Sequence, residues 1–270
     1  MKIDVLTPNI GAEISDIDLS STIRDEEKKQ IYDAFCKHSV IFFRDQNLSP
    51  QQHIELASIF GELEPPTHPK FSSFEDAPEV AIISNDENNP PDINVWHTDL
   101  SYHAQPAKAC VLYCQETPAI GGDTLWASMR AAYQSLSPQL QQLISGLNAR
   151  HLLPLNTVSI EQIKSVIDLE IDAIHPIVHL HPDTKEKCLF VNSVYTQNIL
   201  DLPNIESRNI LQMLFNICEQ AEFQVRFKWR KGSIAIWDNR CTQHYAVADY
   251  FPERRVMHRV SICGDKLISA

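Results

Sequence analysis

Residues 223–263 read FQVRFKWRKGSIAIWDNRCTQHYAVADYFPERRVMHRVSIC and hold three strand-like runs, at 223–230, 233–237 and 256–263. Short apolar runs bounded by polar and turn-forming residues predict buried strands. The pattern recurs along the chain, at 39–44, 79–84, 94–102, 107–115, 123–127, 175–181 and 187–192. Many short strands predict a β-sandwich or jelly roll. A parallel doubly wound sheet fits less well, because the chain has no Gly-rich nucleotide loop.

Helical patterns precede and interrupt these strands. Ser49-Pro50 supplies an N-cap followed by proline at the first helical position, which favours a helix start. Further helices are predicted near 129–146 and 205–220. We therefore predict a mainly β (α+β) chain, with helices packed outside a jelly-roll core, forming one domain over residues 1–270.

The composition is that of a folded protein and excludes wholesale disorder. The 270 residues are 43% hydrophobic, and 23 Lys+Arg against 35 Asp+Glu give a net charge of −12. Such acidity argues against partners such as nucleic acid or an anionic membrane. No run of 18 apolar residues occurs and the N-terminus is acidic, so we expect a cytoplasmic protein.

Seven cysteines are scattered through apolar segments. An odd number without a signal peptide favours reduced thiols. Cys110 and Cys114 form a C-x3-C pair, but no second pair completes a zinc knuckle. We therefore expect these two thiols to pack as small hydrophobic side chains.

The sequence Val95-Trp-His-Thr-Asp99 offers a metal site. In a strand, His97 and Asp99 would point to the same face. A second histidine from elsewhere would complete the two-histidine, one-carboxylate triad that holds Fe(II) and leaves adjacent positions open. The alternative is a histidine and an aspartate that only form hydrogen bonds.

Two segments could supply the second histidine. His179 and His181 share a strand face in HPIVHLHP, but no acidic residue has the matching spacing. His244 lies in a polar and aromatic stretch after an apolar strand. We favour His244, because two arginines that suit anions, Arg255 and Arg259, follow it.

The region that follows His244 is basic. Residues 225–270 hold 9 Lys+Arg against 4 Asp+Glu, a net charge of +5 within the acidic chain. If 254–263 is a strand, Arg255 and Arg259 face one way and Arg254 the other. A turn at 250–253 would fold this strand back beside the one bearing His244. We expect a basic site, with Arg254 paired to surface acids instead.

Taken together, these segments closely resemble the taurine dioxygenase family of Fe(II)- and 2-oxoglutarate-dependent oxygenases. The resemblance covers nearly the whole chain. It rests on WHTDLSY (96–102), GGDTLWAS (121–128), FVN (190–192), EFQVRFKWRKGSIAIWDNRCTQHYAVADY (222–250) and RRVMHRVSICGDK (254–266). It implies a double-stranded β-helix (a cupin-like jelly roll) with flanking helices.

The resemblance also implies roles for individual residues. His97, Asp99 and His244 match the family's iron ligands. Arg255 matches the arginine that binds the distal carboxylate of the cosubstrate 2-oxoglutarate, and Thr124 matches a residue that assists it. Further positions match substrate-contacting residues: His68, Phe71, Asn94, Tyr195 and Arg259. The implied reaction uses O2, and dimers or tetramers are usual in the family.

Around the substrate, this sequence departs from the taurine-specific pattern. Phe71 stands in place of a tyrosine, Tyr195 in place of a phenylalanine, and Ile93, beside Asn94, in place of an asparagine. Such changes can alter substrate preference strongly. The expected small anionic substrate is taurine or a related alkylsulfonate. An alkylsulfate, an aryloxyalkanoate or another small carboxylate stays an alternative, as does a zinc hydrolase or a ligand-binding protein on the same scaffold.

Overall fold

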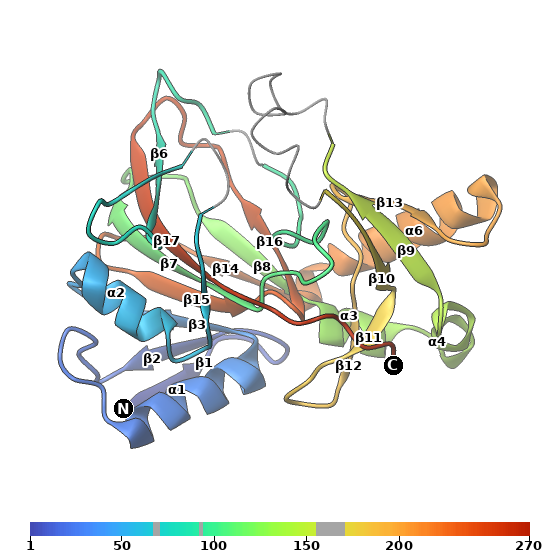
Figure 1. Ribbon diagram of the computed structural model, residues 1–270, viewed down its shortest axis with the longest axis horizontal. Helices are drawn as coiled ribbons and strands as arrows, with labels where there is room; N and C mark the ends of the chain where they lie inside the picture. Colours follow the sequence, from blue (N-terminus) through green and yellow to red (C-terminus); the bar gives the residue numbers. More distant parts are fainter. Residues whose placement is uncertain (67–70, 92–93, 155–170) are drawn as a thin grey trace.

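Two sheets, antiparallel except for the parallel pair of β2 and β3, face each other in the computed structural model, which describes residues 1–66, 71–91, 94–154 and 171–270 (Figure 1). The larger sheet has nine strands in the order β1-β2-β3-β15-β7-β17-β6-β5, and β4 pairs with β17. These strands are β1 (Lys2–Val5), β2 (Ala12–Ser15), β3 (Val40–Phe43), β4 (Leu63–Glu64), β5 (Ser72–Ser73), β6 (Ala81–Asn85), β7 (Ala109–Glu116), β15 (Ile234–Asp238) and β17 (Arg255–Ile262). The smaller sheet has the order β14-β8-β16. Its strands are β14 (Gln224–Phe227), β8 (Thr124–Ser128) and β16 (Thr242–Ala246).

The space between the two sheets is filled by aromatic side chains. Phe42 of the large sheet stacks on Phe227 of the small sheet, with ring centroids 4.1 Å apart. Trp126 of β8 lies 5.7 Å from Trp237 of β15. Because side chains alternate along a strand, the neighbouring Phe43 contributes to the other face of the large sheet.

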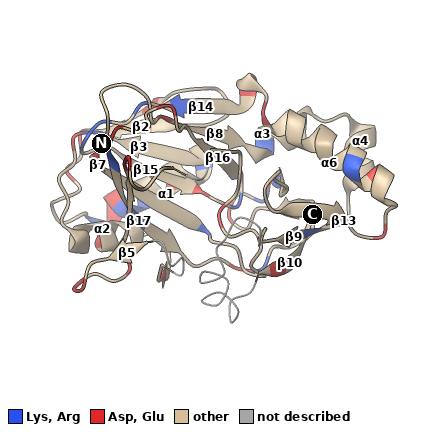
Figure 2. Cartoon of the chain, turned by 90° about the horizontal axis from the view of Figure 1, so that it is seen from above, with Lys and Arg blue, Asp and Glu red and all other residues tan. Residues whose placement is uncertain are grey.

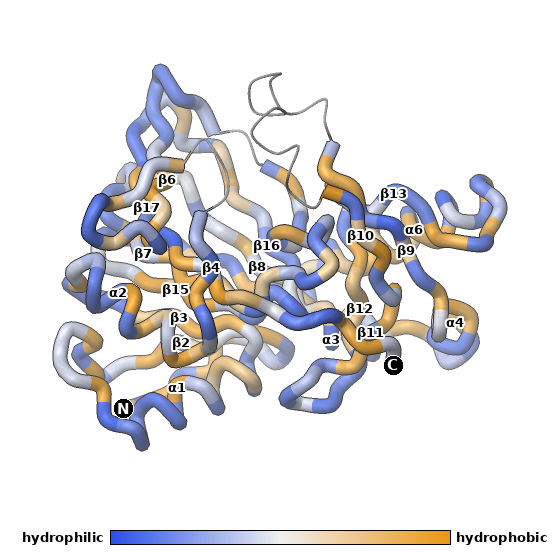
Figure 3. Tube along the Cα trace, viewed as in Figure 1, coloured by the Kyte–Doolittle hydropathy of each residue, from blue (hydrophilic) through white to orange (hydrophobic). Residues whose placement is uncertain are grey.

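Helices α1 (Asp25–His38) and α2 (Pro50–Ala57) cover that other face, as Figure 1 shows. Their buried side chains pack with Phe43 in one apolar cluster. The predicted start of α2 is confirmed, because Ser49 accepts a hydrogen bond from the Gln52 amide in a capping box. The hydrophobic colour of β3 and of the first residues of β15 in Figure 3 accords with burial of both faces of these strands.

A third apolar cluster joins the remaining helices to two small sheets, β10-β9-β13 and β11-β12. Its helices are α3 (Met129–Ser135), α4 (Pro138–Ile144) and α6 (Asn204–Cys218), and a 3₁₀ turn, η2, spans Ala221–Phe223. Its strands are β9 (Asn148–Leu152), β10 (Asp172–Pro176), β11 (Val178–Leu180), β12 (Lys187–Leu189) and β13 (Thr196–Ile199). No helix among the described residues is long and apolar enough to cross a membrane.

The predicted class, mainly β with flanking helices, is confirmed. The predicted strand at 94–102 is wrong: within this segment the chain forms one β-bridge at His97 and then continues into turns. Leu100 has a φ of 53°, which ends any extended run. The turn at 250–253 also leads elsewhere than predicted, because β17 joins the large sheet and faces β16 across the interior.

Candidate metal centre and anion-binding residues

His97 and His244 are brought together by a backbone pair at the edge of the small sheet. The amide of His97 donates to the carbonyl of His244 at 3.0 Å, and the reciprocal bond is 2.9 Å. Strand β16 ends the order β14-β8-β16, so its outer edge is available to this segment. One bridge therefore fixes two residues that are 147 positions apart in the sequence.

Asp99 completes a compact triad. One ligand atom from each of His97, Asp99 and His244 lies within 4.8 Å of the others. Oδ1 of Asp99 is 3.5 Å from Nε2 of His97 and 3.9 Å from Nε2 of His244. Nδ1 of His97 lies 3.0 Å from the carbonyl of Val95, which leaves Nε2 as the ligating nitrogen. Two imidazoles and one carboxylate are the donors that suit non-haem Fe(II).

The charges of the triad are those that a cation requires. Burial, together with the neighbouring His97, lowers the pKa of His244 to about 3. Burial alone would raise the pKa of Asp99, but His244, His97 and Arg259 together hold it well below its usual range. At neutral pH, His244 is neutral and Asp99 is ionised, the forms that bind metals.

Arg255 lies buried in an aromatic cage on β17. Its guanidinium is 5.9 Å from the ring of Trp229 and 5.8 Å from that of Tyr250. Its Nε is buried and has no hydrogen-bond partner among the described residues. Trp229 donates to the hydroxyl of Thr124 at 2.9 Å, so Thr124 and Arg255 contact the same indole. The close approach depends on Gly122, whose φ is +70° and where a Cβ would lie 3.3 Å from Cδ of Arg255.

Arg259 lies nearer to the triad, on the same side of β17. Its Nη1 is 3.8 Å from Oδ1 of Asp99, and its Nε is buried without a partner in the described structure. Its guanidinium lies over the ring of Phe71 at 5.1 Å. Arg254 points away and donates to Glu116 at 3.1 Å, with both side chains exposed. The predicted division of these arginines between interior and surface is confirmed. Figure 2 marks the positions of Lys and Arg along the chain in blue.

The other predicted substrate residues differ in their placement. Tyr195 is buried and its ring lies 5.0 Å from that of Tyr102. Asn94 is exposed and accepts a bond from the Ala248 amide at 3.3 Å, which places its side chain in a loop contact. His68 and Ile93 lie outside the described residues.

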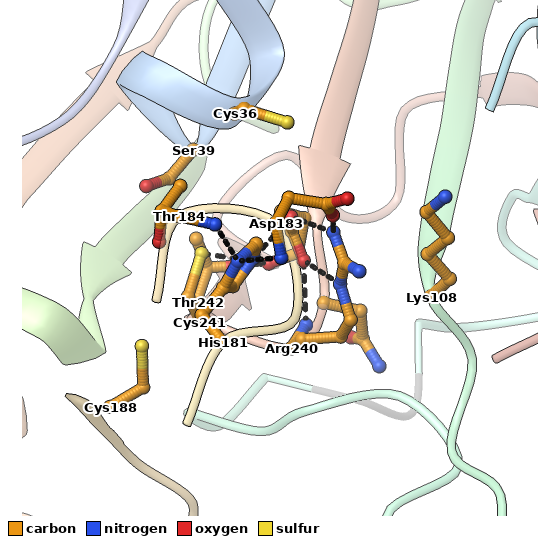
Figure 4. A network of polar contacts seen from close by, with 12 residues as sticks. Cys36, Ser39, Lys108, His181, Asp183, Thr184, Cys188, Arg240, Cys241 and Thr242 are labelled. Atoms are coloured by element: carbon orange, nitrogen blue, oxygen red, sulfur yellow. Dashed lines mark hydrogen bonds and ion pairs between the residues drawn. The ribbon is translucent and has the colours of Figure 1, made fainter. Parts of the chain in front are cut away.

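A second cluster has similar side chains but different bonding (Figure 4). His181, Asp238 and Cys241 also offer three ligand atoms within 4.8 Å. Arg240 makes two bonds to the Asp238 carboxylate, at 2.8 and 2.6 Å, and Nε2 of His181 donates to it at 2.9 Å. Nδ1 of His181 accepts a bond from the Thr184 amide at 3.1 Å. These lone pairs are already occupied, so His181, a histidine of the competitor segment predicted from the sequence, belongs to a hydrogen-bonded ion pair.

His179 of the same segment is also structural. Its Nε2 lies 2.7 Å from the carbonyl of Arg240, within the turn that leads to β16. Burial lowers the pKa of His179 to about 4, so it stays neutral at physiological pH. The histidines at 179 and 181 thus hold the turn that precedes His244.

The sequence did not single out Glu64 or Asn239 as residues near the site. It predicted Cys110 only as a buried apolar thiol and not as a hydrogen-bond donor to Asp99. Cys110 donates to Oδ2 of Asp99 at 3.4 Å, and Asn239 bonds to the backbone of Asp99. Glu64 pairs in register with Ser261, two residues from Arg259. No local pattern marks these contacts, because each joins residues far apart in the chain; only Asn239 lies in a segment that carries the family resemblance.

Residues 2–261 match the Taurine catabolism dioxygenase TauD, TfdA family. The chain belongs to this family. It is 34% identical to an alkylsulfatase from Acinetobacter baylyi, over 96% of this chain and 84% of the relative. It is 29% identical to an alpha-ketoglutarate-dependent 2,4-dichlorophenoxyacetate dioxygenase from Cupriavidus pinatubonensis, over 97% of this chain and 98% of the relative. A crystal structure of a taurine dioxygenase from Burkholderia xenovorans has a TM-score of 0.87 at 33% identity, over 99% of this chain and 91% of that chain.

Membership of the family makes this chain a 2-oxoglutarate-dependent dioxygenase with the jelly-roll fold, as predicted. The zinc-hydrolase alternative loses its basis, because the shared family is one of oxygenases. The relatives differ in the substrates that their names state, so the family leaves the substrate open.

Proposed function

We propose that this dioxygenase hydroxylates the carbon next to the anionic group of a small molecule, taurine or a related alkylsulfonate. The products would be sulfite and an aldehyde, together with succinate and CO2. The observation that carries the proposal is the position of Arg259. Its guanidinium lies 3.8 Å from the Asp99 carboxylate, and its Nε has no hydrogen-bond partner among the described residues. An anion at Arg259 would bring its neighbouring carbon close to the triad.

His97, Asp99 and His244 would hold Fe(II). Bound there with 2-oxoglutarate and O2, the metal supplies the oxidising chemistry that side chains lack. The triad itself contributes one negative charge and two neutral imidazoles, and it leaves part of the coordination sphere for other ligands.

Arg255 and Thr124 would bind the distal carboxylate of 2-oxoglutarate. A buried guanidinium offers paired charge-assisted hydrogen bonds to a carboxylate, and Nε of Arg255 has a donor to spare. Burial lowers the pKa of Arg255, which indicates that an anion would relieve the cost of burying its charge. The hydroxyl of Thr124, oriented by Trp229, would add a further bond.

Glu64 supports a substrate with a positive charge as well as a negative one. Leu63 packs with the helix-side cluster, so the next residue on β4 points to the inner face, as does its register partner Ser261. The half-buried carboxylate of Glu64 makes no hydrogen bond or ion pair among the described residues. Burial raises its pKa, the charge of Arg259 opposes that rise, and Asp99 adds to it. An ammonium group such as that of taurine would compensate this carboxylate.

Sulfite and succinate release from a matched substrate panel test the proposal: taurine, an alkanesulfonate of equal length, an alkylsulfate and an aryloxyalkanoate. We expect coupled sulfite and succinate with the sulfonates, and best turnover with taurine. Glu64→Gln should abolish the preference for taurine over the unsubstituted sulfonate. Sulfonates that leave succinate formation at its background rate would refute the proposed substrate class.

Arg259→Ala and Arg255→Ala separate the two anion sites. Arg259→Ala should raise the KM for the sulfonate by about 100-fold, the loss of a charge-assisted bond, while changing the KM for the cosubstrate little. Arg255→Ala should do the reverse. Equal effects of both variants on both molecules would contradict the assignment.

A further inference from the structure

Asp99 occupies a segment that has little regular structure to hold it. The chain around it forms turns, and the following residue, Leu100, has a φ of 53°. A strand residue would have its backbone fixed by a neighbouring strand, whereas the backbone of Asp99 pairs with a side chain. This side chain belongs to Asn239, in the turn between β15 and β16.

The amide of Asn239 replaces the missing strand neighbour. Its Oδ1 accepts from the Asp99 amide at 3.0 Å, and its Nδ2 donates to the Asp99 carbonyl at 2.8 Å. The same Nδ2 donates to the Ala107 carbonyl at 3.0 Å, just before β7 begins. Asn239 is fully buried, so water does not compete for these bonds. The backbone of Asp99 is thereby tied to the large sheet.

Cys110 contacts the opposite oxygen of the carboxylate. Its thiol lies 3.4 Å from Oδ2 of Asp99, whereas Oδ1 is the oxygen that faces His97, His244 and Arg259. Cys110 is on β7 and fully buried. A thiol is a weak donor, but this one has the carboxylate within reach in a site shielded from water.

We propose that Asn239 and Cys110 are positioning residues that orient Asp99 toward the metal, Asn239 through the backbone and Cys110 through the outer carboxylate oxygen. With Oδ2 held by the thiol, Asp99 would offer only Oδ1 to the ion. Single-oxygen ligation keeps coordination positions open for the cosubstrate and O2. The inference rests on the proposed role of Asp99 as a metal ligand.

Mn(II) affinity, measured by titration calorimetry on otherwise intact protein, tests the proposal. Asn239→Leu and Cys110→Ala should each weaken Mn(II) binding by about 10- to 100-fold, as expected for groups that orient a ligand. Gln46 offers a matched control, because its amide also accepts one backbone N–H and donates to two carbonyls, far from the triad. Cys114, buried in the same apolar cluster as Cys110, gives the second control.

Gln46→Leu and Cys114→Ala should lower the melting temperature while keeping the Mn(II) affinity within about twofold of wild type. Cys110→Ser, which keeps a donor, should restore most of the affinity that Cys110→Ala loses. The infrared S–H stretch assigned to Cys110 should shift when Mn(II) binds. If Asn239→Leu does not fold, Asn239→Asp, which keeps the acceptor but loses both donors, is measured instead with the same expected loss.

Wild-type affinity in both the Asn239 and the Cys110 variants, with an unmoved S–H band, would overturn the inference. Loss in only one variant would remove the other residue from the pair. These results differ from failure of the proposed function, in which Asp99→Ala itself would bind Mn(II) as tightly as wild type.

Discussion

In the part of the chain that the structure describes, two buried clusters of side chains offer ligand atoms within 4.8 Å of one another, and yet they differ in kind. One is His97, Asp99 and His244, and the other is His181, Asp238 and Cys241. In the second, Arg240 already supplies the cation, and both nitrogens of His181 are bonded. In the first, Oδ1 of Asp99 faces two imidazole nitrogens. The guanidinium that lies closest to this oxygen is that of Arg259, at 3.8 Å.

Residue type and spacing alone therefore do not define a metal site. Both clusters have histidine and aspartate within reach of each other, but only one has lone pairs left to donate. A resident guanidinium at the second cluster would have to be displaced before an ion could enter. We therefore assign metal binding to the first cluster and stability to the second.

The largest expected difference is in turnover. His97→Ala should reduce succinate formation with a coupled substrate by at least on the order of 10³-fold, because a first ligand is lost. His181→Gln, whose amide can still donate to Asp238, should keep turnover within about tenfold of wild type. A His97→Ala enzyme with full coupled turnover would contradict the triad.

The next effect is on stability and has the opposite order. Arg240→Met leaves Asp238 buried without its ion pair and should lower the free energy of unfolding by about 3–5 kcal/mol. Asp99→Asn removes a carboxylate whose guanidinium contact is longer, 3.8 Å to Arg259, and should lower the free energy of unfolding by less than Arg240→Met does. Urea denaturation of the metal-free proteins measures both. A smaller loss for Arg240→Met than for Asp99→Asn would reverse the comparison.

His53 separates simple burial of a histidine from metal binding. Burial lowers its pKa to about 3, and it lies on the buried face of α2, with its Nε2 3.3 Å from the Val111 carbonyl. The unfolded chain therefore binds one more proton below about pH 6.5, and stability falls as the pH falls. Between pH 8 and pH 5, wild type should lose about 2 kcal/mol more than His53→Gln. Equal losses in urea denaturation would show that His53 is protonated in the folded protein.

The smallest effect concerns the surface. Arg254→Gln breaks an exposed pair with Glu116 and should cost less than about 1 kcal/mol. Because Arg254 points away from the triad, the KM values for substrate and cosubstrate should stay within about twofold of wild type. A large rise in either KM would move this arginine into the site.

Much of the fold could be predicted from the sequence because its strands carry a strong signal. The apolar runs at 39–44, 107–115 and 233–237 became β3, β7 and β15, which are buried on both faces. The run at 94–102 misled, because a positive φ at Leu100 and a single bridge at His97 depend on tertiary contacts. The sheet that β17 joins could not be predicted from the local sequence either. A turn reverses the direction of the chain but does not determine which strand the next segment pairs with.

Among the site residues too, some features could be predicted from the sequence and others could not. The positions of His97, Asp99, Arg255 and Arg259 followed from spacing and resemblance, and the structure brings the triad and Arg259 together. Their roles stay predictions until tested. The bonded state of His181 could not be predicted, because Arg240 and Thr184 reach it only in the folded chain.

Metal binding at the first cluster and not at the second can be measured by anaerobic Fe(II) titration of wild type, Asp99→Ala and His181→Gln. We expect one tightly bound ion per chain in wild type and in His181→Gln, and none in Asp99→Ala. An ion retained by Asp99→Ala but lost from His181→Gln would show that the two clusters have been assigned the wrong way round.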